Sequence, residues 1–155
     1  MYTIHVTQTF EASIEQVFEA LSDHETFLTR GDTACRLIET GHEERNGVGA
    51  VREVRSGALR FIEAIPEFER PTSYTYRIRT LTVMGLPLPV VHDQGWLEFH
   101  RTTDSTTRVD WRSRFRITIP IIGAWLEPRL GDTFSAAFLA FMKAARTRLE
   151  TGANG

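Results

Sequence analysis

The sequence has little of several features that mark particular classes of protein. It contains one cysteine, Cys35, among 155 residues, so no disulfide can form within the chain. No apolar run approaches the roughly 18 residues that a membrane-spanning helix needs, and no signal-peptide-like segment follows Met1. The net charge is only −2, from 18 basic and 20 acidic residues, and indicates no nucleic-acid partner. We therefore expect a cytoplasmic protein that binds no nucleic acid and does not insert stably into a membrane.

Motifs for metal, nucleotide or covalent chemistry are also missing. The five histidines lack the His-Glu-x-x-His and His-x-His spacings, and the histidine and cysteine set of an iron–sulfur centre is absent. There is no Gly-x-Ser-x-Gly motif, and Cys35 has no evident histidine partner for nucleophilic catalysis. Gly47-Val48-Gly49 lacks the Gly-Lys-Ser/Thr ending of a phosphate loop, so we interpret it as a loop at the rim of a pocket. We expect no metal and no cofactor.

What the chain does have is the composition of one globular domain. Apolar residues make up 41% of it and charged residues 25%, and the aromatic residues are 10 Phe, 3 Trp and 3 Tyr. We predict a single domain over residues 1–150, because no linker, repeat or low-complexity segment divides the chain. Residues 151–155 are polar and rich in glycine, so we expect a disordered tail there.

The start of the chain predicts a strand followed by two short helices. Residues 2–10 alternate between apolar and polar side chains, as a half-buried strand does. Ser13 and Gln16 then form a capping box, in which each side chain satisfies a free amide at the start of a helix. This helix should end by Asp23, and a second helical turn is predicted at 25–28.

The pattern between these helices and Pro120 is almost wholly strand. Alternation predicts strands at 34–40, on both sides of a turn at 56–57, and at 72–80, 94–101 and 108–118. After Pro120, apolar residues recur every three or four positions and predict a helix to about Glu150, with Pro128 in its first turns or at a kink. The apolar stripe of this helix comprises Leu126, Leu130, Phe134, Phe138, Met142, Ala145 and Leu149.

We predict an α+β fold from this order of elements. A curved antiparallel β-sheet of about seven strands wraps around the long C-terminal helix, and the two short helices follow the first strand. A sheet that curls around a single helix has more concave surface than the helix fills. An elongated cavity between the two is therefore expected.

One hairpin can be given a register from the sequence. Ser56-Gly57 is a good two-residue turn because glycine tolerates a positive φ, so we predict that Arg55 pairs with Ala58. Side chains alternate between the two faces of such a hairpin. The predicted interior face comprises Arg52, Val54, Leu59, Phe61, Glu63 and Ile65.

Two charges, Arg52 and Glu63, fall on this otherwise apolar face. In the predicted register Arg52 lies opposite Phe61 and diagonal to Glu63, close enough for the two charges to neutralise each other. One interpretation is a structural ion pair that braces the sheet. The other is contact with a ligand, with Glu63 acting as a base.

Further candidate site residues lie on the inward faces of strands 72–80 and 108–118 and on the last helix. The full set of candidate ligand-binding residues is Arg52, Phe61, Glu63, Tyr74, Tyr76, Trp111, Ser113, Phe115, Phe134 and Phe138. Core packing is the alternative role for the large aromatics. His92 joins Arg52 and Glu63 as a catalytic candidate if it reaches the pocket mouth, and a solvated loop is the alternative. The inward face of strand 94–101 is left open.

Residues 84–91 form an uncharged, mostly apolar connection that would be costly to leave in water. Together with Ile121, Ile122 and Trp125, we interpret this connection as a gate over a pocket. A membrane-touching tip and a homodimer patch are the alternatives. The predicted gate residues are Met84, Leu86, Leu88 and Val90.

Five segments of the chain, taken in order, match a known pattern. They are residues 10–18 (FEASIEQVF) with 21–23 (LSD), 47–52 (GVGAVR), 61–63 (FIE), 106–111 (TTRVDW) and the long terminal helix. Their order resembles the SRPBCC superfamily, also called START-like or helix-grip proteins, and within it the polyketide cyclase/dehydrase group. The family's usual Gly-Thr before the Arg-x-x-Trp stretch is Thr106-Thr107 here. The resemblance covers nearly the whole chain and implies a helix-grip fold.

The resemblance implies an apolar pocket but does not select its ligand. Our preferred hypothesis is a non-catalytic carrier or sensor for a small hydrophobic ligand such as a lipid, polyketide or isoprenoid. The alternatives are an enzyme of the polyketide cyclase or dehydratase type and a protein-interaction module similar to quinone-binding or ribosome-associated members. A closed Arg52–Glu63 pair in an otherwise apolar cavity would favour the carrier. An arginine or acid without a protein partner would favour the enzyme.

Overall fold

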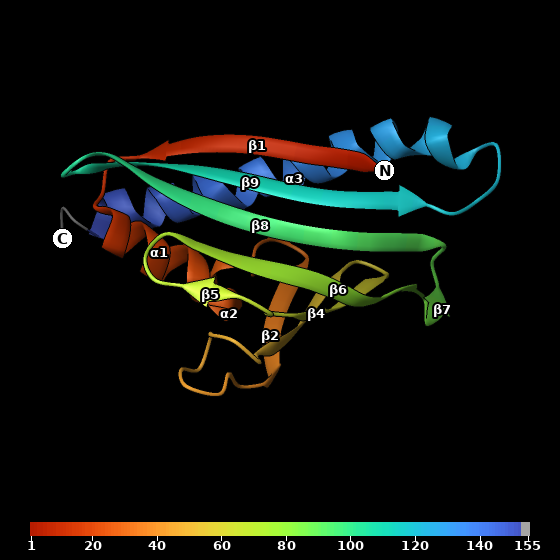
Figure 1. Ribbon diagram of the computed structural model, residues 1–155, viewed down its shortest axis with the longest axis horizontal. Helices are drawn as coiled ribbons and strands as arrows, with labels where there is room; N and C mark the ends of the chain where they lie inside the picture. The colour runs from red at the N-terminus through yellow and green to blue at the C-terminus, as the bar shows by residue number, and fades with distance from the viewer. Residues whose placement is uncertain (153–155) are drawn as a thin grey trace.

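An antiparallel sheet packed against one long helix forms the body of the protein (Figure 1). The computed structural model describes residues 1–152. Its elements are β1 (Tyr2–Phe10), α1 (Ile14–Ser22), α2 (His24–Phe27), β2 (Thr33–Glu39), β3 (Val51–Ser56), β4 (Leu59–Ala64), β5 (Phe68–Glu69), β6 (Ser73–Val83), β7 (Leu86–Pro87), β8 (Val90–Thr103), β9 (Thr106–Ile117) and α3 (Gly123–Gly152). The strand order is β1-β9-β8-β6-β4-β3-β2, and the short strands β5 and β7 pair with β6. The predicted helix-grip fold is confirmed.

The first strand and the two short helices match their predicted positions closely. Helix α1 begins after the predicted capping box, in which the Ser13 side chain accepts from the Gln16 amide and the Gln16 side chain accepts from the Ser13 amide. Its apolar face includes Phe18, which is fully buried against the aromatic rings of Phe68 and Phe99. These helices cover one end of the inner face of the sheet.

Helix α3 lies along β1 and β9 (Figure 1). At Gly131 an added Cβ would lie 2.2 Å from Cε1 of Tyr2, so glycine allows this turn of the helix to approach β1 closely. Pro128 lies inside the helix, in its early turns as predicted. The helix extends two residues past the expected boundary at 150, and the rest of the expected tail lies outside the described residues. No helix within residues 1–152 is long and apolar enough to span a membrane.

The register of the β3–β4 hairpin corrects the predicted one. Ser56 pairs with Leu59, so the two turn residues are Gly57 and Ala58, and Gly57 has the positive φ of 57°. Positive φ at Gly57 and not at Ala58 is the pattern of a type II′ turn, which has glycine at its first central position, so the turn lies one residue later than predicted. Each pairing therefore shifts by two residues, and both faces keep the predicted side chains because the strand period is two.

The apolar connection at 84–91 is more regular than predicted. It contains β7 and the first residues of β8, and the Thr118 amide donates to the Pro89 carbonyl oxygen. Farther along β8, Leu97 and Phe99 are buried and face inward. The inward face of strand 94–101, which the sequence pattern did not determine, is therefore the one that carries Leu97 and Phe99.

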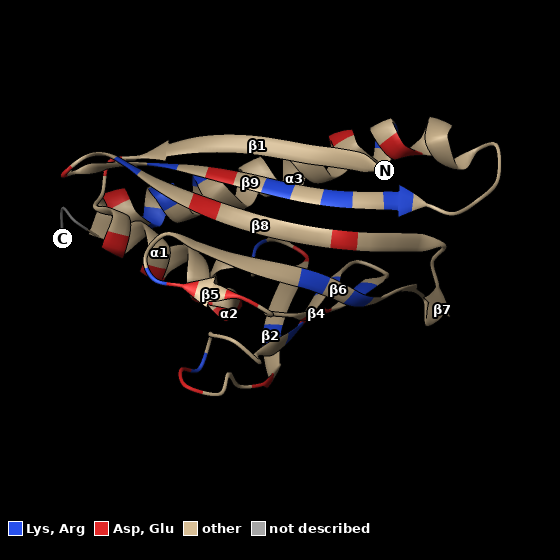
Figure 2. Cartoon of the chain, viewed as in Figure 1, with Lys and Arg blue, Asp and Glu red and all other residues tan. Residues whose placement is uncertain are grey.

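Figure 2 shows basic residues along β6 and β9, and the side chains of Arg77, Arg79, Arg114 and Arg116 on these strands are exposed. Asp110 lies on the outer face of β9 but is buried, at 6% exposed. It accepts hydrogen bonds from His5 and Thr7, and His100 and Arg108 lie beside its second oxygen. Burial alone would raise the pKa of Asp110, but His5, Thr7 and Arg108 lower it to about 2.

Candidate functional site

A cavity of about 130 Å³ lies between the inner face of the sheet and α3. Nine of the ten candidate ligand-binding residues line it, and their role in binding stays a prediction. The exception is Tyr74, which packs under α1 and donates its hydroxyl hydrogen to the Leu21 carbonyl oxygen, 2.8 Å away. The cavity residues missing from the candidate set are Ile4, Leu28, Thr33, Val54, Ser56, Ile78, Leu81, Val90, Leu130, Ala137 and Phe141. Strand parity carried a signal for several of them, including Ile4 and Ile78.

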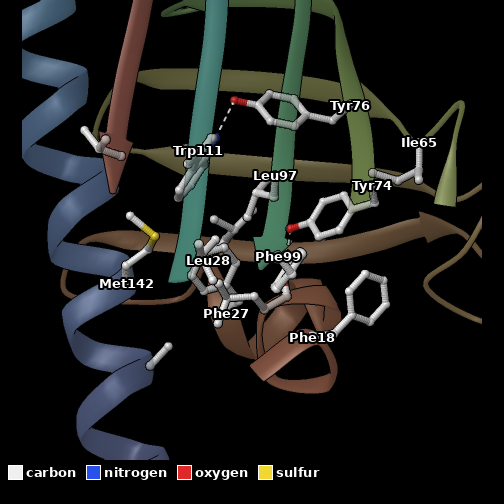
Figure 3. Close-up of a cluster of buried hydrophobic side chains, with 14 of the residues drawn as sticks. Phe18, Phe27, Leu28, Ile65, Tyr74, Tyr76, Leu97, Phe99, Trp111 and Met142 are labelled. Atoms are coloured by element: carbon white, nitrogen blue, oxygen red, sulfur yellow. Dashed lines mark hydrogen bonds between the residues drawn. The ribbon is translucent and has the colours of Figure 1, made fainter. Parts of the chain in front are cut away.

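The cavity wall is mostly aromatic where α3 meets the sheet. Phe138 stacks on Trp111 with the two rings 3.9 Å apart and nearly parallel, at 2°. Nearer the start of the helix, Phe134 contacts Phe61 across the cavity, with ring centroids 6.1 Å apart. Figure 3 shows Trp111 among the buried side chains that continue this wall toward α1 and α2. Three residues of the predicted apolar stripe of α3 therefore line the cavity, namely Leu130, Phe134 and Phe138.

The buried ion pair of Arg52 and Glu63 lies in one wall of the cavity. The two residues are directly paired on β3 and β4, and Arg52 Nε donates to Glu63 Oε2 at 2.6 Å. Arg52 is 1% exposed and Glu63 is 7% exposed. Burial alone would lower the pKa of Arg52, but the adjacent Glu63 carboxylate raises it. Arg52 is therefore charged, and its guanidinium is bonded to a protein carboxylate inside the cavity wall.

His24 completes this cluster, and the sequence gave no sign of it. Its Nε2 lies 2.9 Å from the Asn46 carbonyl oxygen, which can only accept, so Nε2 carries the proton. Nδ1 is then free to accept from Arg52 Nη1, also at 2.9 Å. Burial, followed by the nearby Arg52 charge, holds the pKa of His24 well below its ordinary value. Neutral His24 thus joins α2 to the ion pair.

A second polar group in the cavity wall is built on Tyr76. Trp111 Nε1 donates to the Tyr76 hydroxyl oxygen at 3.0 Å, and the Arg52 guanidinium lies over the Tyr76 ring at 5.0 Å. The ring covers Gly95 of β8, where an added Cβ would lie 2.1 Å from Cζ of Tyr76. Glycine at this position makes room for the tyrosine.

His92 does not lie in a solvated loop, as one prediction had it. It belongs to β8, stacks on the Tyr76 ring at 5.5 Å, and is absent from the cavity lining. Its Nδ1 accepts from the Ile78 amide at 3.1 Å, and its Nε2 lies 2.9 Å from Ser113 Oγ. Burial lowers the pKa of His92 to about 4, so its ring is neutral near pH 7.

The predicted rim and gate segments lie in different places. The Gly47-Val48-Gly49 loop does not line the cavity. Its Gly49 packs against the His42 ring. Among the predicted gate residues, Val90 lines the cavity, Leu88 is half-buried, and Met84 and Leu86 are 84% and 69% exposed. Several lining residues near Val90 are themselves partly exposed, so the cavity reaches solvent at this end. These residues are Ser56, Leu81, Leu130 and Phe134.

A family model described as polyketide cyclase / dehydrase and lipid transport matches residues 1–153. The chain belongs to this family. Membership implies that a hydrophobic ligand binds in the cavity. Within residues 1–152 no group of three or more histidine, cysteine, aspartate or glutamate side chains is placed to hold a metal ion.

Solved structures show the same fold at low sequence identity. A START superfamily protein from Mycobacterium smegmatis is 13% identical with a TM-score of 0.72. The alignment covers 97% of this chain and 99% of that protein. A Thermus thermophilus protein is 15% identical with a TM-score of 0.73 and the same coverage. Norcoclaurine synthase from Thalictrum flavum, solved with dopamine and hydroxybenzaldehyde, is 14% identical with a TM-score of 0.70, covering 97% and 87% of the two chains. No curated protein matches the chain.

Proposed function

We propose that the protein binds a small hydrophobic molecule in this cavity and serves as its carrier or sensor. The closed charge pair carries this proposal. Arg52 is committed to Glu63 and His24, and most of the other lining residues are apolar. Such a site binds mainly by removing apolar surface from water, at about 25 cal/mol per Å², and a few polar groups orient the ligand.

The same contacts argue against acid–base catalysis by the candidate residues. Glu63 Oε2 accepts from Arg52 Nε at 2.6 Å, so this oxygen is already bonded to a guanidinium and is poorly placed to take a proton from a substrate. Both ring nitrogens of His92 are engaged, and the residue does not line the cavity. The carrier or sensor is therefore better supported than the cyclase or dehydratase.

The size of the cavity favours a ligand of about one ring. An apolar protein cavity of about 150 Å³ is known to hold benzene, and the cavity here is about 130 Å³. The solved norcoclaurine synthase holds dopamine and hydroxybenzaldehyde, which are single-ring molecules. A short acyl or isoprenoid chain has a similar volume, whereas a two-chain lipid would need the cavity to open.

Segment 84–91 is proposed as the gate. Val90 lines the cavity. Met84 and Leu86, a few residues earlier in the chain, are exposed to solvent. A small movement of β7 would change access past Val90 without disturbing the buried core. A homodimer patch and a membrane contact are the outcomes that the gate experiment below separates from this role.

Ligand binding is tested by native mass spectrometry against single-ring aromatics, short acyl chains, isoprenoids and polyketides. The expected result is a 1:1 complex from which the molecule is recovered unchanged. Ala137→Phe should fill the cavity and abolish binding, because Ala137 lines it. Ala136→Phe is the matched control, because Ala136 is exposed and outside this cavity.

Recovery of a chemically altered molecule would favour the enzyme over the carrier. Failure of every compound to bind, with Ala137→Phe indistinguishable from the unmodified chain, would contradict the proposal. That result would favour the protein-interaction hypothesis.

A further inference from the structure

Two hydroxyl groups of the cavity, on Tyr76 and Ser113, lie in one row of the sheet. Tyr76 pairs with Gly95 on β8, and Gly95 pairs with Ser113 on β9. Because Gly95 has no side chain, the Tyr76 ring lies across β8, and Figure 3 shows its hydroxyl directed toward Trp111 on β9. The tyrosine hydroxyl is thereby brought toward the strand that holds Ser113.

The Tyr76 hydroxyl keeps its own proton for donation. An indole nitrogen is only a donor, so the 3.0 Å contact with Trp111 Nε1 uses the tyrosine oxygen as an acceptor. Burial raises the pKa of Tyr76, so the hydroxyl stays protonated near neutral pH. The residue is 2% exposed, which leaves this proton little access to bulk water.

The Ser113 hydroxyl also keeps its proton for donation, because its oxygen accepts from His92. A backbone amide can only donate, so the Ile78 amide makes His92 Nδ1 an acceptor and places the histidine proton on Nε2. His92 Nε2 therefore donates to Ser113 Oγ at 2.9 Å. The serine oxygen accepts, and its own proton remains to be donated from a residue that is 4% exposed.

The protein itself does not satisfy both protons. Tyr76 and Ser113 are hydrogen-bonding partners of each other, and no acceptor outside this pair occurs for their protons in the hydrogen bonds of residues 1–152. If one hydroxyl donates to the other, one proton is still left. A buried donor without an acceptor is costly, and a ligand oxygen would remove that cost.

We infer that the ligand carries an uncharged acceptor oxygen, such as a carbonyl, which Tyr76 and Ser113 bind while the apolar body fills the cavity. This inference rests on the proposed function and adds to it the chemical class and the orientation of the ligand. The oxygen lies at β9, and the apolar body extends toward the phenylalanines of α3.

Charge in the cavity selects against anions. Arg52, the one basic residue in the cavity lining within residues 1–152, is committed to Glu63 and His24, so it is not available to a ligand carboxylate. Glu63 itself would repel that carboxylate at close range. A fatty acid or an aromatic acid should therefore bind much more weakly than a ketone or aldehyde of the same shape.

Three probes of nearly the same shape test this inference. Acetophenone has a carbonyl oxygen, α-methylstyrene has a methylene group in its place, and benzoate has a carboxylate. Dissociation constants are measured by titration calorimetry or ligand-observed NMR for the unmodified chain and for Tyr76→Phe and Ser113→Ala. The quantity compared is the ratio of the acetophenone constant to the α-methylstyrene constant, because this ratio cancels general changes in cavity volume.

Each variant should raise this ratio about five- to tenfold, the loss expected for one hydrogen bond. Tyr74→Phe is the matched control and should leave the ratio unchanged, because the Tyr74 hydroxyl is bonded to Leu21 outside the cavity. The two variants are measured separately, so a folding defect in one does not prevent the test. Thermal unfolding confirms that each variant is folded.

The outcomes separate this inference from the proposed function. If α-methylstyrene binds and neither variant changes the ratio, the hydroxyls do not recognise the ligand and the inference is wrong, while the proposed function stands. Benzoate binding as tightly as acetophenone would also overturn it. If none of the three probes binds, this inference fails, and the proposed function fails with it only if no compound of the wider panel binds either.

Discussion

Removing the charge of Glu63 tests the buried pair most directly. In Glu63→Gln the amide oxygen can still accept from Arg52, but the guanidinium loses the one carboxylate recorded against it within residues 1–152. Arginine cannot escape by losing its proton, and breaking a buried pair from one side costs about 3–5 kcal/mol. Because the amide keeps one hydrogen bond, we expect a loss of about 3–4 kcal/mol in the free energy of unfolding. A domain with about 5–15 kcal/mol should still fold cooperatively.

The cost of the reverse substitution should depend on pH and should be the smaller of the two at pH 5. In Arg52→Met the remaining carboxylate can take up a proton, at about 1.4 kcal/mol for each pH unit above about 4.3. The electrostatic cost relative to the unmodified chain is then limited to about 3.7 kcal/mol at pH 7 and about 1 kcal/mol at pH 5. Arg52→Met/Glu63→Leu removes both charges and should lie within about 2 kcal/mol of the unmodified chain or exceed it.

Urea unfolding followed by tryptophan fluorescence at pH 7 and pH 5 measures all three variants. Glu98→Gln is the matched control, because Glu98 pairs with Arg112 on the partly exposed outer face and should cost less than about 1 kcal/mol. Equal losses for Glu63→Gln and Arg52→Met at both pH values would refute the reasoning. A Glu63→Gln loss no larger than that of Glu98→Gln would refute it as well.

Three further predictions follow from other contacts. Gly95→Ala should lower the free energy of unfolding by about 1–3 kcal/mol, because its Cβ would meet Tyr76 at 2.1 Å; an unchanged urea midpoint would contradict this packing. Burial lowers the pKa of His92 to about 4, so below about pH 6.5 the unfolded chain takes up a proton that the folded chain does not. Stability should therefore fall by about 1.4 kcal/mol per pH unit from about 6.5 to 4, and His92→Gln should remove that part of the slope, whereas an unchanged slope would count against it. The exposed pair change Met84→Ser/Leu86→Ser should alter stability by less than about 0.5 kcal/mol but change the rates of acetophenone binding and release in stopped-flow measurements. Unchanged rates would reject the gate, and lost dimerisation or vesicle binding would support one of its alternatives.

The inner face of the β3–β4 hairpin was predictable although its register was not. Side-chain alternation placed Arg52 and Glu63 on one face, and a shift of two residues in the pairing preserves that face. The turn was misplaced by one residue because either dipeptide around Gly57 gives an acceptable hairpin turn. The corrected register is what brings the two charges directly opposite each other.

His24 and Gly95 were not predictable from local pattern. A helix of four residues has no apolar periodicity, so nothing in the sequence connects His24 to Arg52, 28 positions away. Gly95 has its role because of one ring from a neighbouring strand, and that contact exists only in three dimensions. His92 was misassigned because its strand begins in an apolar segment that contains two prolines.

The close approach of α3 to β1 at Gly131 limits the size of the cavity between α3 and the sheet. Gly131 touches Tyr2 and is not part of the cavity lining. A larger side chain there would lift the first half of α3 from β1 and carry Phe134 and Phe138 away from the sheet. The depth of the cavity can therefore be changed at a position that does not contact the ligand. Substitutions at residue 131, by engineering or in evolution, would change the size of the ligand that fits.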